Sequence, residues 1–328
     1  MQFASRLCRN AAQAVAAAAM LIAFHASAAD EWPTHPIKMI VPYAPGGGTD
    51  IIARAVASKL SARLGQPIIV ENKSGAGGSL GVDLAAHAQP DGYTILFMTT
   101  AFATNAATGM KLPYDAIKDF QPVGEIGETP LLVVVPTDSK VKTLGDLVQV
   151  AREKPNTVTY GSSGVGSMSH LGMQLLATET KVQFLHVPYK GMAPAFTDLV
   201  AGNVQAALCT FASATSLLNA GKVRAVALAS DKRSGFATKL PTAAEEGFPD
   251  FKIDFWWGLM VPARVPPSIV KKLNSELNTT LQQPEMQKVL AREAAVPTPG
   301  SSEEFGKRVS SEIVRWSKLV KDSNIAIN

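Results

Sequence analysis

Short apolar runs alternate along the chain with segments whose apolar residues recur at helical spacing. The runs that predict strands are Ile37–Val41, Ile68–Val70, Tyr93–Met98, Leu131–Val135, Val158–Tyr160, Val182–Val187, Ala206–Cys209, Ala225–Leu228 and Phe255–Val261. In the helical segment after the first run, Ile52, Val56 and Leu60 share one face, and Thr49 or Asp50 is expected to cap it. Apolar strands that alternate with helices are typical of parallel sheets covered on both faces, so we expect an α/β fold.

The last part of the chain is predicted to be helical. Its helices are expected at Pro267–Gln282, Pro284–Arg292 and Ser302–Lys321. Ser301 and Glu304 have the spacing of a capping box, which predicts the start of the last helix.

Glycine-rich loops follow several of the predicted strands. Two lie near the start, at Tyr43–Asp50 and Glu71–Gly78, and two lie beyond the middle, at Tyr160–Ser167 and Val187–Gly191. Each leads into a helical pattern, and this arrangement directs free backbone N–H groups at a bound anion. Glycine also lets a ligand approach the backbone closely. We therefore interpret the loops as a site for a small anion between two α/β units; tight turns without a ligand are the alternative.

The first 28 residues resemble a secretory signal. Arg6 and Arg9 precede an apolar stretch at Ala11–Phe24, and Ala26–Ala28 supplies small residues for cleavage near Ala28. We expect an exported protein whose remaining cysteine, Cys209, has no internal disulfide partner. Losing two arginines and no acids would lower the formal charge from +4 to +2. The basic residues are scattered, so no nucleic-acid partner is expected.

Motifs for catalysis or cofactor binding are incomplete in this sequence. It contains no Gly-x-Ser-x-Gly elbow, no phosphate-binding Gly-Lys-Ser/Thr loop and no His, Cys or acidic set with metal-ligand spacing. We therefore predict no catalytic residues, no cofactor and no metal. The alternative is a hydrolase or isomerase that uses Ser167 and His170, although a packed or hydrogen-bonded role is expected for His170.

The order and spacing of these motifs resemble the periplasmic solute-binding proteins of tripartite tricarboxylate transporters, the Bug family. The resemblance implies a type II, two-lobed Venus-flytrap protein with two crossover strands, near Val123–Pro130 and Phe251–Gly258. Lobe 1 would then comprise residues 29–126 and 255–328, and lobe 2 residues 127–254. The matching stretches are Pro36–Asp50, Leu64–Gly78, Pro90–Tyr93, Val187–Gly191, Asp198–Gly202, Leu240–Pro249 and Trp257–Pro262.

The resemblance also implies a monomer in the periplasm that captures a small di-, tri- or aromatic carboxylate for integral-membrane permease subunits. A ligand sensor without a transporter is the alternative. Tyr43, Phe102, Phe211 and Trp256 could accept a bulky apolar ligand body, and the lack of an acid in Ala206–Phe211 argues against an amino acid. The implied ligand-binding residues are Tyr43, Ala44, Gly46, Gly47, Gly48, Thr49, Gly75, Ala76, Gly77, Gly78, Ser79, Thr100, Phe102, Ser162, Ser163, Gly166, Ser167, Tyr189, Lys190, Gly191, Thr210 and Phe211.

Overall fold

The structure is a computed structural model that describes residues 32–323 of the 328-residue chain. The predicted signal segment, residues 1–28, lies outside the described residues. Within 32–323, no helix combines the length and the apolar character needed to cross a membrane.

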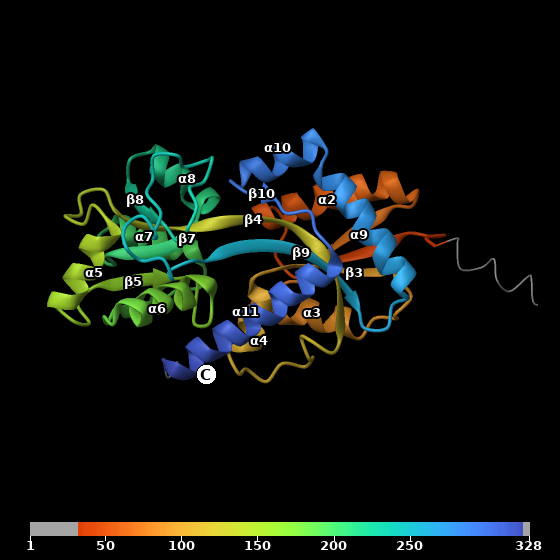
Figure 1. The fold of residues 1–328 in the computed structure, drawn as a ribbon, viewed down its shortest axis with the longest axis horizontal. Helices are drawn as coiled ribbons and strands as arrows, with labels where there is room; N and C mark the ends of the chain where they lie inside the picture. Colours follow the sequence, from red (N-terminus) through yellow and green to blue (C-terminus); the bar gives the residue numbers. More distant parts are fainter. Residues whose placement is uncertain (1–31, 324–328) are drawn as a thin grey trace, which may run out of the picture.

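Strands and helices alternate through most of the described chain (Figure 1). The strands are β1 (Ile37–Val41), β2 (Ile68–Asn72), β3 (Thr94–Thr99), β4 (Phe120–Pro136), β5 (Thr159–Ser162), β6 (Leu185–Pro188), β7 (Ala206–Thr210), β8 (Val223–Leu228), β9 (Asp254–Pro262) and β10 (Val296–Pro297). The helices are α2 (Gly48–Leu64), α3 (Ser79–Ala86), α4 (Ala101–Ala107), α5 (Leu144–Glu153), α6 (Met168–Thr180), α7 (Met192–Val200), α8 (Phe211–Asn219), α9 (Pro267–Leu281), α10 (Pro284–Arg292) and α11 (Ser302–Asp322).

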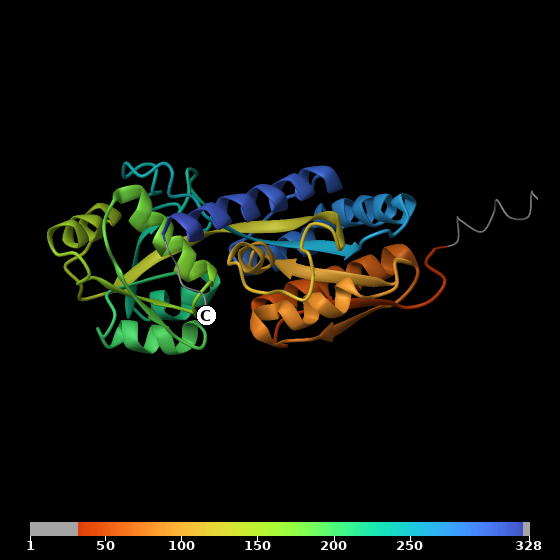
Figure 2. The ribbon, with the colours of Figure 1, turned by 90° about the horizontal axis from the view of Figure 1, so that it is seen from below.

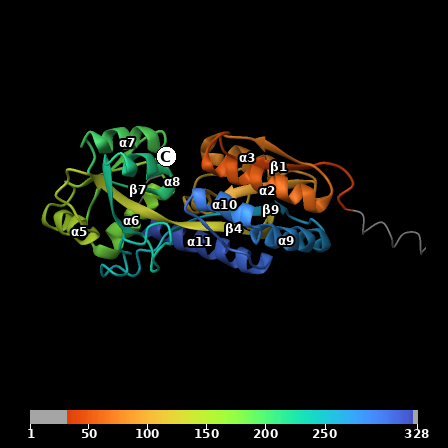
Figure 3. The same cartoon turned by 90° about the horizontal axis from the view of Figure 1, so that it is seen from above.

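The strands form two parallel groups, one in each lobe. Strands β2, β1 and β3 are parallel neighbours in lobe 1, and β6, β5 and β7 are parallel neighbours in lobe 2. Figures 2 and 3 show the two lobes side by side with helices covering both groups. The carboxyl ends of parallel strands share one edge of a sheet, so the loops after β1, β2 and β3 lie together, as do those after β5, β6 and β7.

Two long strands join the lobes. Strand β4 pairs with β9 from Phe120 to Pro130 and then, from Leu131 onward, with β7 and β8 of lobe 2. The resemblance implies a crossover strand near Val123–Pro130 and the sequence pattern predicts a strand at Leu131–Val135; the structure joins both in one continuous strand of 17 residues. Two register shifts, at Pro122/Gly124 and Glu125/Gly127, accommodate the residues that interrupt its apolar pattern.

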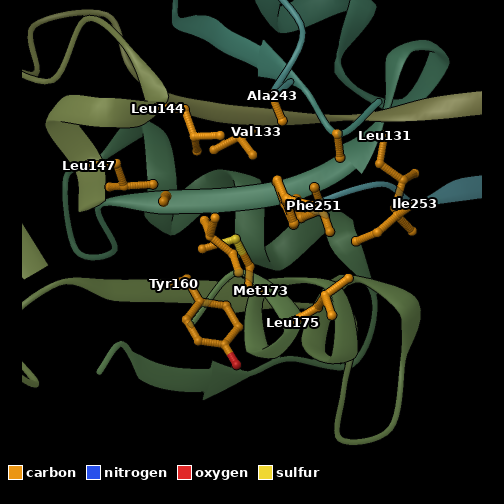
Figure 4. Packing of buried hydrophobic residues seen from close by; sticks show 14 of the residues in the cluster. Leu131, Val133, Leu144, Leu147, Tyr160, Met173, Leu175, Ala243, Phe251 and Ile253 are labelled. Carbon is orange, nitrogen blue, oxygen red and sulfur yellow. The ribbon is translucent and has the colours of Figure 1, made fainter. Parts of the chain in front are cut away.

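Each lobe has its own hydrophobic core. Figure 4 shows the core of lobe 2, where Leu131 and Val133 of β4 meet Met173 and Leu175 of α6 and the Tyr160 ring of β5. In lobe 1, α2 and α9 bury a second cluster against β1, β3 and β9. The parallel groups are therefore anchored independently on either side of the crossover strands.

Helix α11 belongs to both lobes. Phe305 and Val309, near its start, pack in a lobe 1 cluster, whereas Trp316 and Leu319 pack in the core of lobe 2. Figure 2 shows the helix running alongside β4 from one lobe toward the other. The apolar face of α11 is long enough to cover parts of both cores, so this helix adds a further connection between the lobes beside the crossover strands.

The predicted capping box at the start of α11 is confirmed. The Ser301 hydroxyl accepts the Glu304 N–H at 3.1 Å, and the Glu304 carboxylate accepts the Ser301 N–H at 2.7 Å. We expect Ser301→Ala to lower the free energy of unfolding by about 1 kcal/mol, because it leaves an N–H of the first turn without its acceptor. Urea unfolding would measure this, with Ser310→Ala, an exposed mid-helix substitution, as the control. Equal stability of both variants would contradict it.

Candidate functional site

A cavity of about 290 Å³ lies between the lobes. Gly48, Thr49, Trp257 and Glu293 line it from lobe 1, Thr210, Ala212 and Ser213 line it from lobe 2, and Phe255 of the crossover strand β9 completes the wall. Of the residues predicted from the sequence to bind a ligand, Gly48, Thr49 and Thr210 are brought together here. The cavity is therefore the place where a bound molecule would touch both lobes.

The first glycine loop leads into α2 with its amides uncapped. The N-cap is Gly47, which contributes no side-chain hydrogen bond, so the prediction that Thr49 or Asp50 caps this helix is wrong. Asp50 instead accepts the Gly46 N–H at 3.0 Å from within the first turn. A Cβ added at Gly46 or Gly47 would meet no atom within 4 Å, so this stretch of backbone is open to a ligand.

A buried acid holds the first loop in place. Asp50 is 3% exposed and accepts hydrogen bonds from Arg54 at 2.9 Å and from the Asn72 amide at 2.8 Å. Burial pushes the pKa of Asp50 upward, but the hydrogen bonds from Arg54, Gly46 and Asn72 outweigh it and hold the pKa below its ordinary value. The same Asn72 amide donates to the Tyr43 carbonyl, which fixes the loop to β2.

The second glycine loop is built from left-handed backbone. Gly75, Ala76, Gly77 and Gly78 all have positive φ, and the chain turns through them into α3. Gly75, Ala76 and Gly77 are exposed, whereas Gly78 and Ser79 are buried, and Ser79 donates to the Ala76 carbonyl. Within this loop, Gly75, Ala76 and Gly77 are therefore the predicted ligand-binding residues that are accessible at the surface.

Tyr43 connects the two glycine loops of lobe 1. Its ring lies 3.6 Å from the position of a Cβ on Gly78, and its hydroxyl is 2.6 Å from the Thr99 hydroxyl at the end of β3. The ring is half-buried and Ala44 beside it is exposed. The loops after β1 and β2 are thus held next to each other, as the parallel pairing of their strands requires.

The loop after β3 does not contribute a ligand surface. Thr100 is fully buried, and its hydroxyl accepts the Trp256 N–H at 2.9 Å. Phe102 is 2% exposed and packs edge-on against Phe120, because helix α4, which the sequence pattern did not predict, turns this ring into the lobe 1 core. Trp256 is also fully buried, so the structure places Thr100, Phe102 and Trp256 in the packed interior of lobe 1.

In lobe 2, the loop after β5 satisfies most of its own amides. Gly164 N–H donates to the Ser162 hydroxyl, Ser163 N–H to the Ser169 hydroxyl and Gly166 N–H to His170 Nδ1, at 3.0 to 3.1 Å. Of the predicted ligand-binding residues in this loop, Ser162 and Gly166 are buried, whereas Ser163 and Ser167 are partly exposed. This loop is therefore braced by side chains rather than left open like the first loop of lobe 1.

A stack of three rings lies under this loop. His170 and His186 are parallel with centroids 3.9 Å apart, and Tyr160 stacks on His186 at 5.0 Å. Burial lowers the pKa of both histidines to about 4, and in His170 the neighbouring His186 adds to the shift. The rings are consequently neutral at pH 7, and the packed role expected for His170 is confirmed.

The geometry does not supply the Ser167–His170 pair of the enzyme alternative. His170 Nδ1 accepts the Gly166 N–H, while the Ser167 hydroxyl donates to the Gly164 carbonyl and accepts the His170 N–H as the N-cap of α6. Ser162 does contact His186 Nε2 at 2.6 Å, but Ser162 is fully buried, beyond the reach of a substrate. Among residues 32–323 no cluster of His, Cys, Asp and Glu could hold a metal ion.

The other lobe 2 residues differ in how they face the cleft. The Tyr189 hydroxyl donates to Asp198 at 2.5 Å within its own lobe, and Lys190 is exposed. Gly191 is the N-cap of α7 and is open, since a Cβ there would meet nothing within 4 Å. Thr210 caps α8 and Phe211 is half-buried at its start.

Sequence analysis missed five residues of the cavity. Ala212 and Ser213 lie on α8, a helix that the pattern did not indicate, and Trp257 was included only in the predicted strand Phe255–Val261. Phe255 was assigned only to a strand. Glu293 follows α10, more than 200 residues from the first glycine loop, and is carried to Gly48 by the packing of α10 on α2. No motif marks it, so only the folded chain could reveal it.

Comparison with known proteins agrees with this architecture. A protein from Pseudomonas sp. (strain P51), encoded in the tcbD-tcbE intergenic region, is 36% identical over 300 residues, which cover 91% of this chain and 89% of the relative. The structure of R. palustris Rpa4515 with adipate matches with a TM-score of 0.79 at 35% identity, covering 90% of this chain and 99% of that one. MatC from Rhodopseudomonas palustris with bound malate matches with a TM-score of 0.76 at 32% identity, covering 88% and 100%.

A family model covers most of the described chain. The model of the tripartite tricarboxylate transporter family receptor, TctC, matches residues 52–325, which include all the strands from β2 onward. The match extends through both lobes and the crossover strands. The chain therefore belongs to the TctC family of tripartite tricarboxylate transporter receptors.

Proposed function

We propose that this protein is a periplasmic receptor that captures a small organic acid between its lobes and presents it to integral-membrane permease subunits. The observation that carries the proposal is the 290 Å³ cavity, to which both lobes contribute. A ligand there gains contacts with lobe 2 only when the lobes approach, so binding favours the closed form. The adipate and malate complexes of the two R. palustris proteins support a carboxylate as the ligand.

The chemistry of the first loop suits a carboxylate. The uncapped amides at the start of α2 and the positive end of its helix dipole favour a negative charge by roughly 0.3–1 kcal/mol. Amide donors also bind a carboxylate through charge-assisted hydrogen bonds, without the desolvation penalty of burying a charged side chain beside it. We further propose that the receptor acts as a monomer, loses its signal near Ala28 and releases its ligand unchanged.

A substitution that fills the cavity tests this proposal. We expect Ala212→Trp to weaken binding of an organic acid at least tenfold, about 1.4 kcal/mol, because the indole would occupy space between the lobes. Calorimetric titration with a panel of di-, tri- and aromatic carboxylates measures the effect. Ala220→Trp, at the exposed C-cap of the same helix, is the matched control and should bind like the unmodified protein.

Two results would count against the proposal. One is that no organic acid raises the melting temperature of the unmodified protein, since a ligand at 100 times its Kd should stabilise the fold by about 2.7 kcal/mol. The other is unchanged affinity in Ala212→Trp, which would place the bound acid elsewhere.

A further inference from the structure

The cavity contains one charged side chain, Glu293. The other residues that line it are glycine, alanine, hydroxyl residues and aromatic residues. The Glu293 carboxylate packs directly on the first turn of α2, because a Cβ added at Gly48 would lie 2.2 Å from its Oε2 and 2.4 Å from its Cδ. The negative charge of Glu293 therefore influences which ligands the cavity can bind.

The Glu293 carboxylate has no counter-charge among residues 32–323. Burial raises its pKa, and no hydrogen bond or cation among these residues offsets that effect. The buried acids nearby are paired, as Asp50 is with Arg54 at 2.9 Å. The start of α2 favours this negative charge by only roughly 0.3–1 kcal/mol. A ligand that supplies a positive charge would offset the remaining desolvation penalty of the carboxylate.

The Phe255 ring, which also lines the cavity, suits a cation as well, since it is half-buried whereas Trp257 is only 3% exposed. Phe255 and Trp257 meet edge to face with centroids 5.1 Å apart, and the Trp257 indole N–H donates to the Thr49 hydroxyl at 3.2 Å. Aromatic faces attract ammonium groups, the more strongly when these are desolvated. A second carboxylate in the same place would instead face Glu293 with like charge.

We propose that Glu293 determines the ligand specificity of this cleft, and that the captured acid carries an ammonium or other cationic group that pairs with Glu293 beside the Phe255 ring. This inference rests on the proposed function and narrows its ligand class to zwitterionic carboxylates. It also revises the argument from the sequence against an amino acid, which considered only the strand that leads to Thr210. An acidic partner for an ammonium group, Glu293, does line the cavity, but lobe 1 supplies it.

The test compares three series of ligands on the purified protein by calorimetric titration. The ω-amino acids from β-alanine to 6-aminohexanoate are each matched with the straight-chain monocarboxylate and the dicarboxylate of the same length. We expect the best amino acid to bind at least about tenfold more tightly than its monocarboxylate and dicarboxylate counterparts. Glu293→Gln should abolish this preference, because the amide keeps the shape and loses the charge.

Two further variants separate charge from packing. Glu285 lies on α10 and its side chain is 66% exposed. The variant Glu285→Gln should therefore keep the preference for amino acids. Gly48→Ala retains the acid but displaces its carboxylate, and should also reduce the preference. Melting temperatures of the free proteins confirm that each variant is folded.

The outcomes distinguish this inference from the proposed function. Tighter binding of dicarboxylates, or an amino-acid preference that survives Glu293→Gln, would overturn the role of Glu293 and leave organic-acid capture standing. If no member of any series binds, and no other organic acid stabilises the protein, the proposed function fails and the inference fails with it.

Discussion

Replacing Arg308 by methionine is expected to lower the free energy of unfolding by about 3 kcal/mol at pH 8. Arg308 of α11 lies where the crossover strands meet, and its guanidinium is 2.6 Å from both Glu125 and Glu128 of β4. Asp254 of β9 and Glu312 lie 3.9 and 3.6 Å away. One cation thus faces four acids, and its removal leaves them in a partly buried site without a counter-charge.

The loss should depend on pH in a defined direction. Burial raises the pKa of Glu125 to about 7, and burial together with Glu128 raises that of Asp254 to about 6. These folded-state values exceed the ordinary 4.5 and 3.8, so the folded protein binds more protons than the unfolded chain between about pH 4 and 7. Stability from these groups therefore rises as the pH falls through that window. Arg308 lowers both pKa values, so its removal raises them further; the variant then gains more stability at low pH than the unmodified protein and should recover much of its loss at pH 5.

Urea unfolding at pH 8 and pH 5 measures both effects. Lys307→Met is the matched control, because Lys307 precedes Arg308 on the same helix but pairs with Glu303 at an exposed site, where both side chains are more than 70% exposed. Its stability should change little at either pH. An equal loss for Arg308→Met at both pH values would show that the packing of the arginine stem matters, rather than the charge.

Much of the fold follows from local patterns in the sequence. Ile37–Val41, which is apolar except for Lys38, and Ala206–Cys209 are short apolar runs, and the structure places both in parallel groups covered by helices. The capping box at Ser301 is equally local, since its atoms lie within one turn. Such elements could be predicted because neighbouring residues determine them.

The family resemblance implies where the crossover strands lie, but the continuity of β4 could not be predicted from local pattern. Pro122, Gly124, Gly127 and Pro130 interrupt the apolar pattern of β4, and each ordinarily indicates a turn or a strand end. Pairing with β9 overrides these preferences: Gly124 and Gly127 sit at register shifts, and Gly127 leaves room for the Val296 carbonyl, which would lie 2.7 Å from a Cβ. Only a partner strand distant in the sequence explains the continuous strand.

In the candidate site, too, some features could be predicted from local sequence and others depend on the folded chain. The first glycine loop could be located from its sequence, because glycine, strand and helix are local features. The sequence could not show which loop amides remain free for a ligand. In the loop after β5, the side chains of Ser169 and His170, which follow the loop, accept hydrogen bonds from its amides. Glu293 is the extreme case, because its place beside Gly48 depends on the packing of two distant helices.

Gly258→Val is the second substitution that we expect to be strongly destabilising, and it should lower the free energy of unfolding by about 3 kcal/mol. Gly258 lies in the middle of β9, opposite Met98 of β3 and Glu125 of β4. A Cβ there would lie 2.2 to 3.0 Å from three ring carbons of Phe305. That ring is 2% exposed and stacks edge-on against Trp256, so it cannot move aside without disturbing the lobe 1 core and the start of α11.

A double-mutant cycle in urea unfolding tests the cause of this loss. Phe305→Ala alone should destabilise by about 3–5 kcal/mol, whereas the pair should cost at least about 1 kcal/mol less than the sum, because the valine then enters the space left by the ring. Gly235→Val, in an exposed loop where a Cβ meets nothing within 4 Å, is the control for losing a glycine. Strictly additive losses would mean that β9 itself, and not the Phe305 contact, excludes a side chain at position 258.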